Sequence, residues 1–309
     1  MVTFSLAVLI GVFLPVQTAA NSKLRIFVKS PYLSSMISFF IATAFLILTS
    51  LLTHSAILIS SHLMAAVPWW AWLGGVVGVI GLTANILLFP VLGSVQTVIM
   101  PILGQVLMSL LIDNFGWFNV AQKPLDLLKI VGALVLIVGV ILIVVVPTLG
   151  TNNAQSQPKS LWIWQIVGVI AGMLVASQSA INGELGIALQ SSMHAALISF
   201  AVGSIILLII VGLFQRRLTD IKLAFGQGKP WWIWIGGFLG AFFVFGNAYL
   251  VPIIGTGAVV VLALLGQMIS SLVVDQFGLL GATVKKIVPI QIVGIIVLFV
   301  GVALIDLIG

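Results

Sequence analysis

The chain has 309 residues, contains no cysteine, and is 61% hydrophobic but only 6% charged, with a mean hydropathy of +1.34. Charged residues make up about a quarter of a soluble domain, so this composition excludes a water-soluble globular protein, and the missing cysteine excludes disulfides and thiolate chemistry. The net charge of +6 does not indicate nucleic-acid binding, because basic residues between apolar runs orient a membrane protein instead.

Ten apolar runs follow one another along the chain, each long enough to cross a ~30 Å hydrocarbon layer as a helix. A lipid-exposed backbone must satisfy its own hydrogen bonds, and the alternating pattern of barrel strands is not seen in the sequence. We therefore predict an all-α membrane protein with ten transmembrane helices. The predicted spans are about 3–20, 33–53, 69–89, 93–112, 127–147, 162–180, 193–213, 231–251, 255–274 and 288–308.

The sequence is an internal duplication. Residues 69–147 align with residues 231–309 without a gap, and upstream of them the same alignment continues with the interval one residue shorter. We predict a first five-helix repeat at 1–150, a polar linker at 151–160 and a second five-helix repeat at 161–309. The matched pairs include Gly11 and Gly172, Gln17 and Gln178, Asn21 and Asn182, Asn85 and Asn247, Pro90 and Pro252, Gln105 and Gln267, and Asp113 and Asp275.

Basic residues gather on one side when the predicted loops are assigned to alternating sides. Because Lys and Arg favour the cytoplasmic side, both termini are predicted to lie outside. An odd number of spans per copy makes the second copy enter from the opposite face, so the repeats are predicted to be inverted. One side receives Lys23, Arg25, Lys29, Lys159, Arg216, Arg217, Lys222, Lys229, Lys285 and Lys286, and the other only Lys123 and Lys129.

Several motifs recur in both copies: Gln-x3-Asn late in the first helix, a Trp-rich entry to the third helix with Asn-x4-Pro at its end, and Gly-Gln-x3-Ser-x3-Asp in the fourth. In this combination the chain resembles the YdcZ-like family of bacterial inner-membrane exporters, in a fused two-repeat form, within the drug/metabolite transporter (DMT) superfamily. The resemblance implies a ten-helix inverted-repeat EamA/DMT-like fold in the bacterial cytoplasmic membrane, and an export role without an assured substrate. Small multidrug members of that superfamily rely on a carboxylate in the first helix, whereas spans 3–20 and 162–180 contain none. This departure puts proton coupling by that route in doubt.

Polar residues recur four residues apart inside the fourth helix of each copy. Such spacing places a trio on one helical stripe, and groups of this kind are costly in hydrocarbon. They are predicted either to form a cavity wall or to bond between helices, with each Asp at the wet end of its span. The trios are Gln105, Ser109 and Asp113, and Gln267, Ser271 and Asp275.

Amides in the first and third helices of each copy are further candidates for a substrate-binding cavity. Gln17 and Asn21, like Gln178 and Asn182, either face substrate or cap and cross-link helices near a membrane surface. Asn85 and Asn247 either line the cavity or bridge the carbonyl that the nearby proline leaves unpaired. Glu184, in contrast, is predicted to be a solvated loop charge.

Tryptophans and glycines are given structural roles. The Trp69-Trp70-x-Trp72 and Trp231-Trp232-x-Trp234 motifs are typical of an aromatic belt at the membrane surface, with the wall of a hydrophobic site as the alternative. Glycines spaced four or seven residues apart permit close helix contact. They are Gly74, Gly78, Gly132, Gly139, Gly168, Gly172, Gly236, Gly240, Gly294 and Gly301.

Inverted repeats favour alternating access around a midplane site. We predict a secondary transporter, an exporter of a small neutral, zwitterionic or amphipathic compound, because no Lys or Arg lies in the middle of a span to pair with a strong charge. Any proton coupling is predicted to run through Asp113 or Asp275. The alternatives are a channel-like pore and an intramembrane enzyme acting on a lipid carrier, although no catalytic constellation is found. The expected partners are the small-molecule substrate and the bilayer, without cofactor, metal or nucleic acid. The oligomeric state stays open, and two repeats in one chain favour a monomer.

Overall fold

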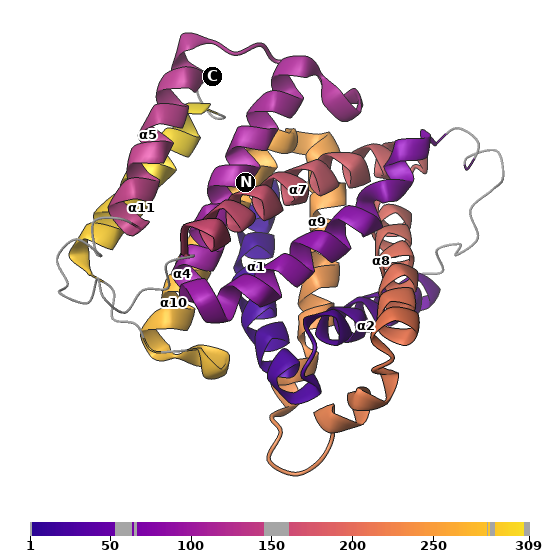
Figure 1. Cartoon of the computed structure of the whole chain (residues 1–309). Coiled ribbons are helices and arrows are strands. Elements are labelled where there is room, and N and C mark those ends of the chain that lie inside the picture. The colour runs from indigo at the N-terminus through magenta and orange to yellow at the C-terminus, as the bar shows by residue number, and fades with distance from the viewer. Residues whose placement is uncertain are drawn as a thin grey trace.

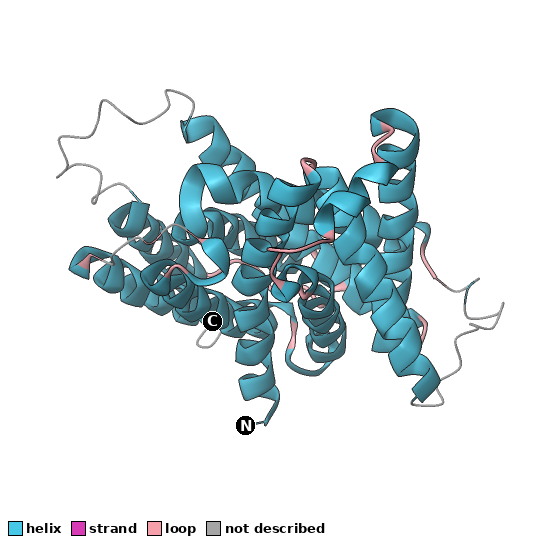
Figure 2. Cartoon of the chain, turned by 90° about the horizontal axis from the view of Figure 1, so that it is seen from below, coloured by secondary structure: helices cyan, strands magenta, loops and turns pink. Residues whose placement is uncertain are grey.

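The computed structural model describes residues 2–52, 64, 67–144, 161–282, 284 and 288–305, and most of them lie in helices (Figures 1 and 2). No strand occurs among these residues, as predicted for an all-α protein. The predicted linker with Lys159, and also Lys285 and Lys286, lie outside them. The principal helices are α1 Val2–Val28, α2 Pro31–Leu52, α4 Gly74–Phe115, α5 Leu127–Val144, α7 Leu161–Ala188, α8 Ser192–Ile209, α9 Gly236–Ile254, α10 Thr256–Phe277 and α11 Pro289–Ala303. Shorter helices are η1 Trp69–Leu73, η2 Trp117–Asn119, η4 Ile210–Gln215, η5 Leu218–Ala224, η6 Trp231–Trp234 and η7 Leu279–Gly281.

Eight segments of the described chain are long and apolar enough to cross a membrane, and the shorter apolar helices α5 and α11 bring the series to the ten predicted. Their outer surfaces carry large apolar side chains: Leu134 of α5 is 59% exposed and Ile296 of α11 is 58% exposed. Apolar surface on this scale suits lipid better than water, so the chain is a multi-pass membrane protein.

The third and fourth predicted spans form one continuous element, α4, with a break at Gly93. The φ of Gly93 is 77° and its ψ is 174°, a conformation that a residue with a Cβ avoids. In the second copy the equivalent glycine, Gly255, has φ 85° and ψ 157° and separates α9 from α10. Glycine at these two positions therefore lets each copy turn between consecutive spans without a loop.

Two prolines just before these breaks leave a backbone carbonyl unpaired, because proline lacks the N–H that would reach it. For Pro90 the carbonyl is that of Ile86, which accepts a bond of 3.2 Å from Nη1 of Arg25. For Pro252 the carbonyl is that of Ala248, which accepts a bond of 3.1 Å from the hydroxyl of Ser192. In each copy a side chain therefore donates a hydrogen bond to the carbonyl that proline leaves unpaired. The donor is a guanidinium of α1 in the first copy and a hydroxyl of α8 in the second.

Contacts between the copies are reciprocal. A Cβ placed on Gly11 of α1 would lie 1.9 Å from the carbonyl oxygen of Ala263 in α10, and one on Gly172 of α7 would lie 1.9 Å from that of Pro101 in α4. Gly172 is the counterpart of Gly11, and Pro101 is the counterpart of Ala263. Exchange of the two copies therefore leaves the contacts unchanged, as a two-fold axis between them requires.

The equivalent helices α5 and α11 show the relative direction of the copies (Figure 1). Gly132, near the start of α5, packs on the carbonyl of Gly301, near the end of α11, while Gly139 packs on Leu298. The two helices therefore run antiparallel, and the repeats are inverted as predicted. The small-residue contacts predicted for these glycines are confirmed as well.

The first span is longer than predicted. Helix α1 continues to Val28, so Lys23 and Arg25 belong to the helix itself and not to a loop. Asn21 likewise lies in the helix interior, and the interpretation that it caps the end of the first span is wrong. Because the helix continues past Asn21, its last two turns carry two basic residues, Lys23 and Arg25, and Lys29 follows directly after its end.

Candidate functional site

A small central cavity lies on the two-fold axis. Its volume is about 40 Å³, and its lining consists mostly of equivalent pairs. The pairs are Leu14 and Val175, Gln17 and Gln178, Phe39 and Phe200, Gly78 and Gly240, Gly81 and Phe243, and Leu82 and Val244, joined by Asn85. The rings of Phe39 and Phe200 meet at 5.0 Å in an edge-on arrangement. Three helices of one copy, α1, α2 and α4, thus face their counterparts α7, α8 and α9 across this cavity.

The amides of Gln17 and Gln178 are held against glycines of the opposite copy. A Cβ on Gly240 would lie 2.5 Å from Nε2 of Gln17, and a Cβ on Gly78 would lie 2.5 Å from Nε2 of Gln178. Both amides are buried, Gln17 at 4% exposure and Gln178 at 9%. The glycines predicted to permit close helix contact therefore make room for these polar side chains. Their placement in the cavity supports the candidacy of Gln17 and Gln178, and substrate binding by them stays a prediction.

Asn85 and Asn247 do not bridge the proline-freed carbonyls, which bond instead to Arg25 and Ser192. Asn247 donates from Nδ2 to the carbonyl of Phe243 in its own helix, at 2.7 Å. Oδ1 of Asn85 is buried without a hydrogen-bond partner in the structure, and Asn85 lines the central cavity. An unpaired acceptor at this point is costly unless water or a ligand reaches it. The bridging interpretation is therefore wrong, and Asn85 is the stronger binding candidate of the two.

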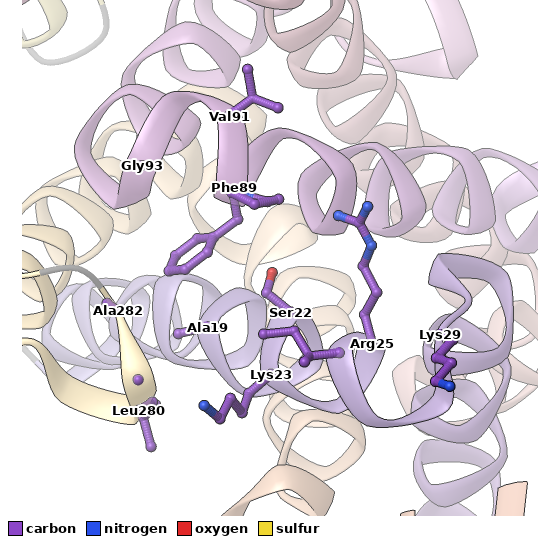
Figure 3. Close-up of a pocket in the computed structure, with 13 residues that line it drawn as sticks. Ala19, Ser22, Lys23, Arg25, Lys29, Phe89, Val91, Gly93, Leu280 and Ala282 are labelled. Atoms are coloured by element: carbon purple, nitrogen blue, oxygen red, sulfur yellow. The ribbon is translucent and has the colours of Figure 1, made fainter. Parts of the chain in front are cut away.

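A second cavity, of about 650 Å³, lies beside the C-terminal end of α1 (Figure 3). We call it the basic vestibule. It is lined by Ala19, Ser22, Lys23, Arg25, Ile26 and Lys29 of α1 and its end, by Phe89, Pro90, Val91 and Gly93 of α4, and by Leu280, Gly281 and Ala282. No carboxylate is among these lining residues, so three cations face the cavity without an acid in its wall.

A third cavity, of about 290 Å³, is the symmetry counterpart of the second. We call it the acidic vestibule. Its lining includes Ala180, Gly183, Glu184, Ile187, Pro252 and Gly255, which are the counterparts of Ala19, Ser22, Lys23, Ile26, Pro90 and Gly93. Asp113, Phe118, Asn119, Val120, Ala121, Lys123 and Val251 complete it.

The two vestibules open at opposite ends of the bundle. The basic vestibule is formed where α1, the first half of α4 and α10 end, which are the first, third and ninth spans. The acidic vestibule is formed where the second half of α4, α7 and α9 end, which are the fourth, sixth and eighth. Successive spans cross in opposite directions, so odd and even spans end on opposite sides. The central cavity lies between the vestibules, one turn deeper along α1 and α7.

Glu184 is not the solvated loop charge that the sequence predicted. It lies inside α7, is half-buried and accepts a bond of 2.9 Å from Nδ2 of Asn119, within the acidic vestibule. Asp113 lines the same vestibule. Two carboxylates and one cation, Lys123, therefore line this cavity, in contrast to the three cations of its counterpart.

Asp275, the counterpart of Asp113, has a different environment. Its carboxylate is 2% exposed, and Oδ2 accepts a bond of 3.0 Å from the backbone N–H of Val95. Val95 lies just after the Gly93 break, where a new run of helix begins with unpaired N–H groups. Asp275 thus caps the second half of α4 from another helix, and the interpretation of it as a wet interfacial charge is wrong.

Other predicted candidates lie outside these three cavities. Asn21 donates from Nδ2 to the hydroxyl of Ser38, and Asn182 donates in the same way to Ser199, so both link neighbouring helices. Ser109 and Ser271 bond to carbonyls of their own helices. Gln105 and Gln267 are buried, each with an Nε2 that lacks a partner in the structure. Of the six Gln, Ser and Asp residues predicted to form a cavity wall in the fourth and ninth spans, only Asp113 therefore lines one of the described cavities.

Sequence reasoning missed Ser22, Lys23, Arg25 and Lys29 as site residues. The charge difference between the copies was visible, and it was used only to orient the chain. Comparison of equivalent positions could have found the vestibules, because Ser22, Lys23, Arg25 and Lys29 correspond to Gly183, Glu184, Gly186 and Gln190. Among the described residues no group of His, Asp or Glu is arranged to hold a metal ion.

Two inverted all-helical copies around a buried central cavity, with a vestibule at each end, define an α-helical membrane protein with the inverted-repeat architecture that many transporters share. The model of the DMT_YdcZ family, described as "Putative inner membrane exporter, YdcZ", matches residues 2–142 and 163–304, and the chain belongs to this family of inner-membrane proteins. A solved structure titled "Crystal structure of protein" is similar in fold, with a TM-score of 0.62, 14% identity and coverage of 98% of this chain and 99% of that chain. A search of curated proteins found no match.

Proposed function

We propose that the chain is a secondary transporter that exports a small amphipathic compound by alternating access. The observation that carries this proposal is the central cavity, which lies on the two-fold axis midway between two equivalent vestibules at opposite ends. Inverted repeats whose site lies on their symmetry axis can exchange conformations, so that a site open to one side becomes open to the other.

The central cavity is closed to substrate in this conformation. A cavity of about 40 Å³ has room for only a few water molecules. Ligand cavities for small molecules measure about 300–1,000 Å³. Helices that close the cavity must therefore separate before a metabolite can enter it, as an occluded transporter requires and a permanently open pore does not.

The moving parts are the helices whose contacts meet at the cavity. Gln17 of α1 sits on Gly240 of α9, and Gln178 of α7 sits on Gly78 of α4. Opening of the first contact on one side while the second stays closed produces one access state, and the exchanged arrangement produces the other. The breaks at Gly93 and Gly255 are placed to absorb this change, because glycine tolerates large changes in φ and ψ.

An accessibility experiment tests alternating access without knowledge of the substrate. A cysteine replaces Gln17 in the naturally cysteine-free chain, and a membrane-impermeant maleimide is applied to intact cells and to inverted vesicles. Labelling from each side in separate experiments is expected, since the residue is exposed to each face in turn. A cysteine at Leu136, buried between α5 and α11, is the control and should label from neither side. Labelling of Gln17→Cys from one side only contradicts the proposal.

Transport itself is tested after a ligand has been found by thermal stabilisation of the purified protein against metabolite pools. Reconstituted vesicles preloaded with that ligand should accumulate labelled ligand by counterflow. Downhill flux without counterflow would identify a channel instead, and chemical conversion of the ligand would identify an enzyme. Both outcomes overturn the proposed function.

A further inference from the structure

The basic vestibule contains more than the positive charge that orients a membrane protein. Ser22 is 7% exposed, and its hydroxyl has no hydrogen-bond partner in the structure. Figure 3 shows this hydroxyl and the guanidinium of Arg25 both reaching from α1 toward the part of α4 that carries Phe89 and Val91. A buried hydroxyl left unpaired beside a cavity is costly, and a ligand that accepts a hydrogen bond from it offsets that cost.

Arg25 is held in place by its bond to the carbonyl of Ile86. That bond uses one of the five N–H donors of the guanidinium and holds the group near α4. A guanidinium held in this way presents its remaining donors in a planar fork that matches a carboxylate or a phosphate. Lys23 supplies a further cation beside Gly281, where a Cβ would lie 3.3 Å from its Nζ.

Apolar side chains line the rest of this cavity. They include Phe89, Ile26 and Leu280, and the cavity, at about 650 Å³, has the size of a small-molecule site. A cation near a helix C-terminus also interacts favourably with the helix dipole, which accounts for Lys29 at the end of α1. It does not account for Ser22, which is uncharged and lies in the helix interior.

From these observations we infer that the basic vestibule binds an anionic group, a carboxylate or a phosphate ester, carried on an apolar body. This deepens the proposed function, on which it rests for the step from binding to transport, by naming an amphipathic organic anion as the substrate class. The prediction of a small neutral, zwitterionic or amphipathic substrate rests on the absence of Lys and Arg in the middle of the spans, and the lining of the central cavity has only amides as polar side chains. The three cations of the basic vestibule favour an anionic head group at the entrance.

Binding is tested with hexyl phosphate and the full-length protein purified in dodecyl maltoside, with the melting temperature recorded during titration. Hexyl glucoside and hexyltrimethylammonium carry the same chain on a neutral and a cationic head. Hexyl phosphate is expected to raise the melting temperature in a saturable way, and the two other compounds are not. Equal stabilisation by hexyl glucoside would overturn the inference, because the apolar body alone would then explain binding.

Two variants place in the basic vestibule the residues that the second copy carries at the same positions. Lys23→Glu introduces the residue type found at its counterpart, Glu184, and Ser22→Gly introduces the residue type found at its counterpart, Gly183. The equivalent helix positions accommodate both residue types in the second copy. Lys23→Glu should weaken hexyl phosphate binding by about fivefold or more, and Ser22→Gly by roughly twofold to tenfold. Lys222→Glu makes the same charge change on the exposed η5 outside the vestibule, and it should bind as the unaltered chain does. Unchanged binding in both vestibule variants would overturn the inference.

An anionic lipid offers the same chemistry as a free amphipathic anion, and the bilayer composition distinguishes these two sources. In nanodiscs of phosphatidylcholine alone, hexyl phosphate should bind as it does in detergent. If phosphatidylglycerol in the nanodisc displaces it, the vestibule holds a lipid headgroup, and if binding is unaffected, the vestibule selects a soluble anion. Binding of hexyl phosphate without counterflow would refute the proposed transport and leave the anion site intact. Counterflow of another compound by a protein that does not bind hexyl phosphate would refute the anion site alone.

Discussion

The two vestibules are formed by equivalent backbone segments of the two copies and differ in their polar side chains. Alanine, proline and glycine are kept at the equivalent positions 19 and 180, 90 and 252, and 93 and 255. At other equivalent positions the residues differ: Lys23 corresponds to Glu184, and Arg25 corresponds to Gly186. Residues that fix the shape are thus common to both copies, whereas residues that fix the charge are not. The difference shows that shape and electrostatics are set by separate positions in this fold.

The largest expected effect concerns the membrane face on which each vestibule opens. A cysteine replacing Glu184 should label with an impermeant maleimide in intact cells, and one replacing Lys23 only in inverted vesicles, because the termini are predicted to lie outside. The effect is all-or-none. Cysteines at Ser60 and Gln227 serve as external and cytoplasmic controls. Labelling of both vestibules from one face would refute the inverted arrangement.

Shared shape predicts equal damage when either copy is overpacked. Gly11→Ala and Gly172→Ala each place a Cβ 1.9 Å from a backbone carbonyl of the other copy. Each should destabilise the fold by roughly 3 kcal/mol or more, seen as a lower melting temperature and less monodisperse protein in gel filtration. Gly186→Ala is the matched control, since its Cβ would meet no atom closer than 3.5 Å. Damage from only one of the two variants would show that the copies do not pack reciprocally.

Divergent chemistry predicts unequal damage at the proline-freed carbonyls. Arg25→Ala leaves the carbonyl of Ile86 without its donor and should cost about 1–3 kcal/mol. Ser192→Ala leaves that of Ala248 unpaired and should cost less, about 1 kcal/mol, because the lost donor is neutral. Thermal denaturation of the purified variants measures both. A larger loss for Ser192→Ala would contradict this ranking.

The central cavity should respond differently from the buried amides outside it. Gln17→Ala and Gln178→Ala should each lower counterflow about tenfold, which corresponds to roughly 1.4 kcal/mol of lost interaction. Gln105→Ala and Gln267→Ala should transport more nearly like the unaltered chain, because these residues lie outside the three cavities. Their Nε2 atoms have no partner, so any loss of stability should come from the cavity that truncation leaves and not from a lost hydrogen bond at Nε2. Loss of transport in the second pair alone would move the site to the fourth and ninth spans.

The smallest expected effects separate the two equivalent aspartates. Asp275→Asn weakens a helix cap and should cost about 1 kcal/mol of stability. Asp113→Asn, in the acidic vestibule, should leave the melting temperature unchanged and abolish any response of transport to an imposed pH gradient in vesicles. A response that survives Asp113→Asn and disappears in Asp275→Asn would assign the proton to the other side of the molecule.

The fold was predictable because it depends on patterns that the sequence displays twice. Apolar runs fix the spans, and the repeated Asn-x4-Pro-x2-Gly pattern at Asn85–Gly93 and Asn247–Gly255 marks where one span turns into the next. The inversion followed from an odd number of spans per copy and is confirmed by the antiparallel contacts of α5 and α11. Local composition and parity therefore sufficed for the architecture.

The site was only partly predictable, because its members meet across copies. Gln17 and Asn21 carry the same amide chemistry one turn apart in α1, yet one lines the cavity and the other bonds to Ser38. Asp113 and Asp275 occupy equivalent positions, yet one lines a vestibule and the other caps α4. Sequence spacing indicates which residues share a helix face, and it does not say which partner helix covers that face.

The divergence at Lys23 and Glu184 has a consequence for direction. In an antiparallel pair of identical chains, symmetry would impose the same side chains on both entrances, so the two entrances could not differ in charge. Duplication within one chain removes that constraint, because each entrance is encoded by its own codons. The basic vestibule at one end then attracts an anion, and the acidic vestibule at the other end repels it. The protein thereby has an electrical polarity that two identical halves could not have.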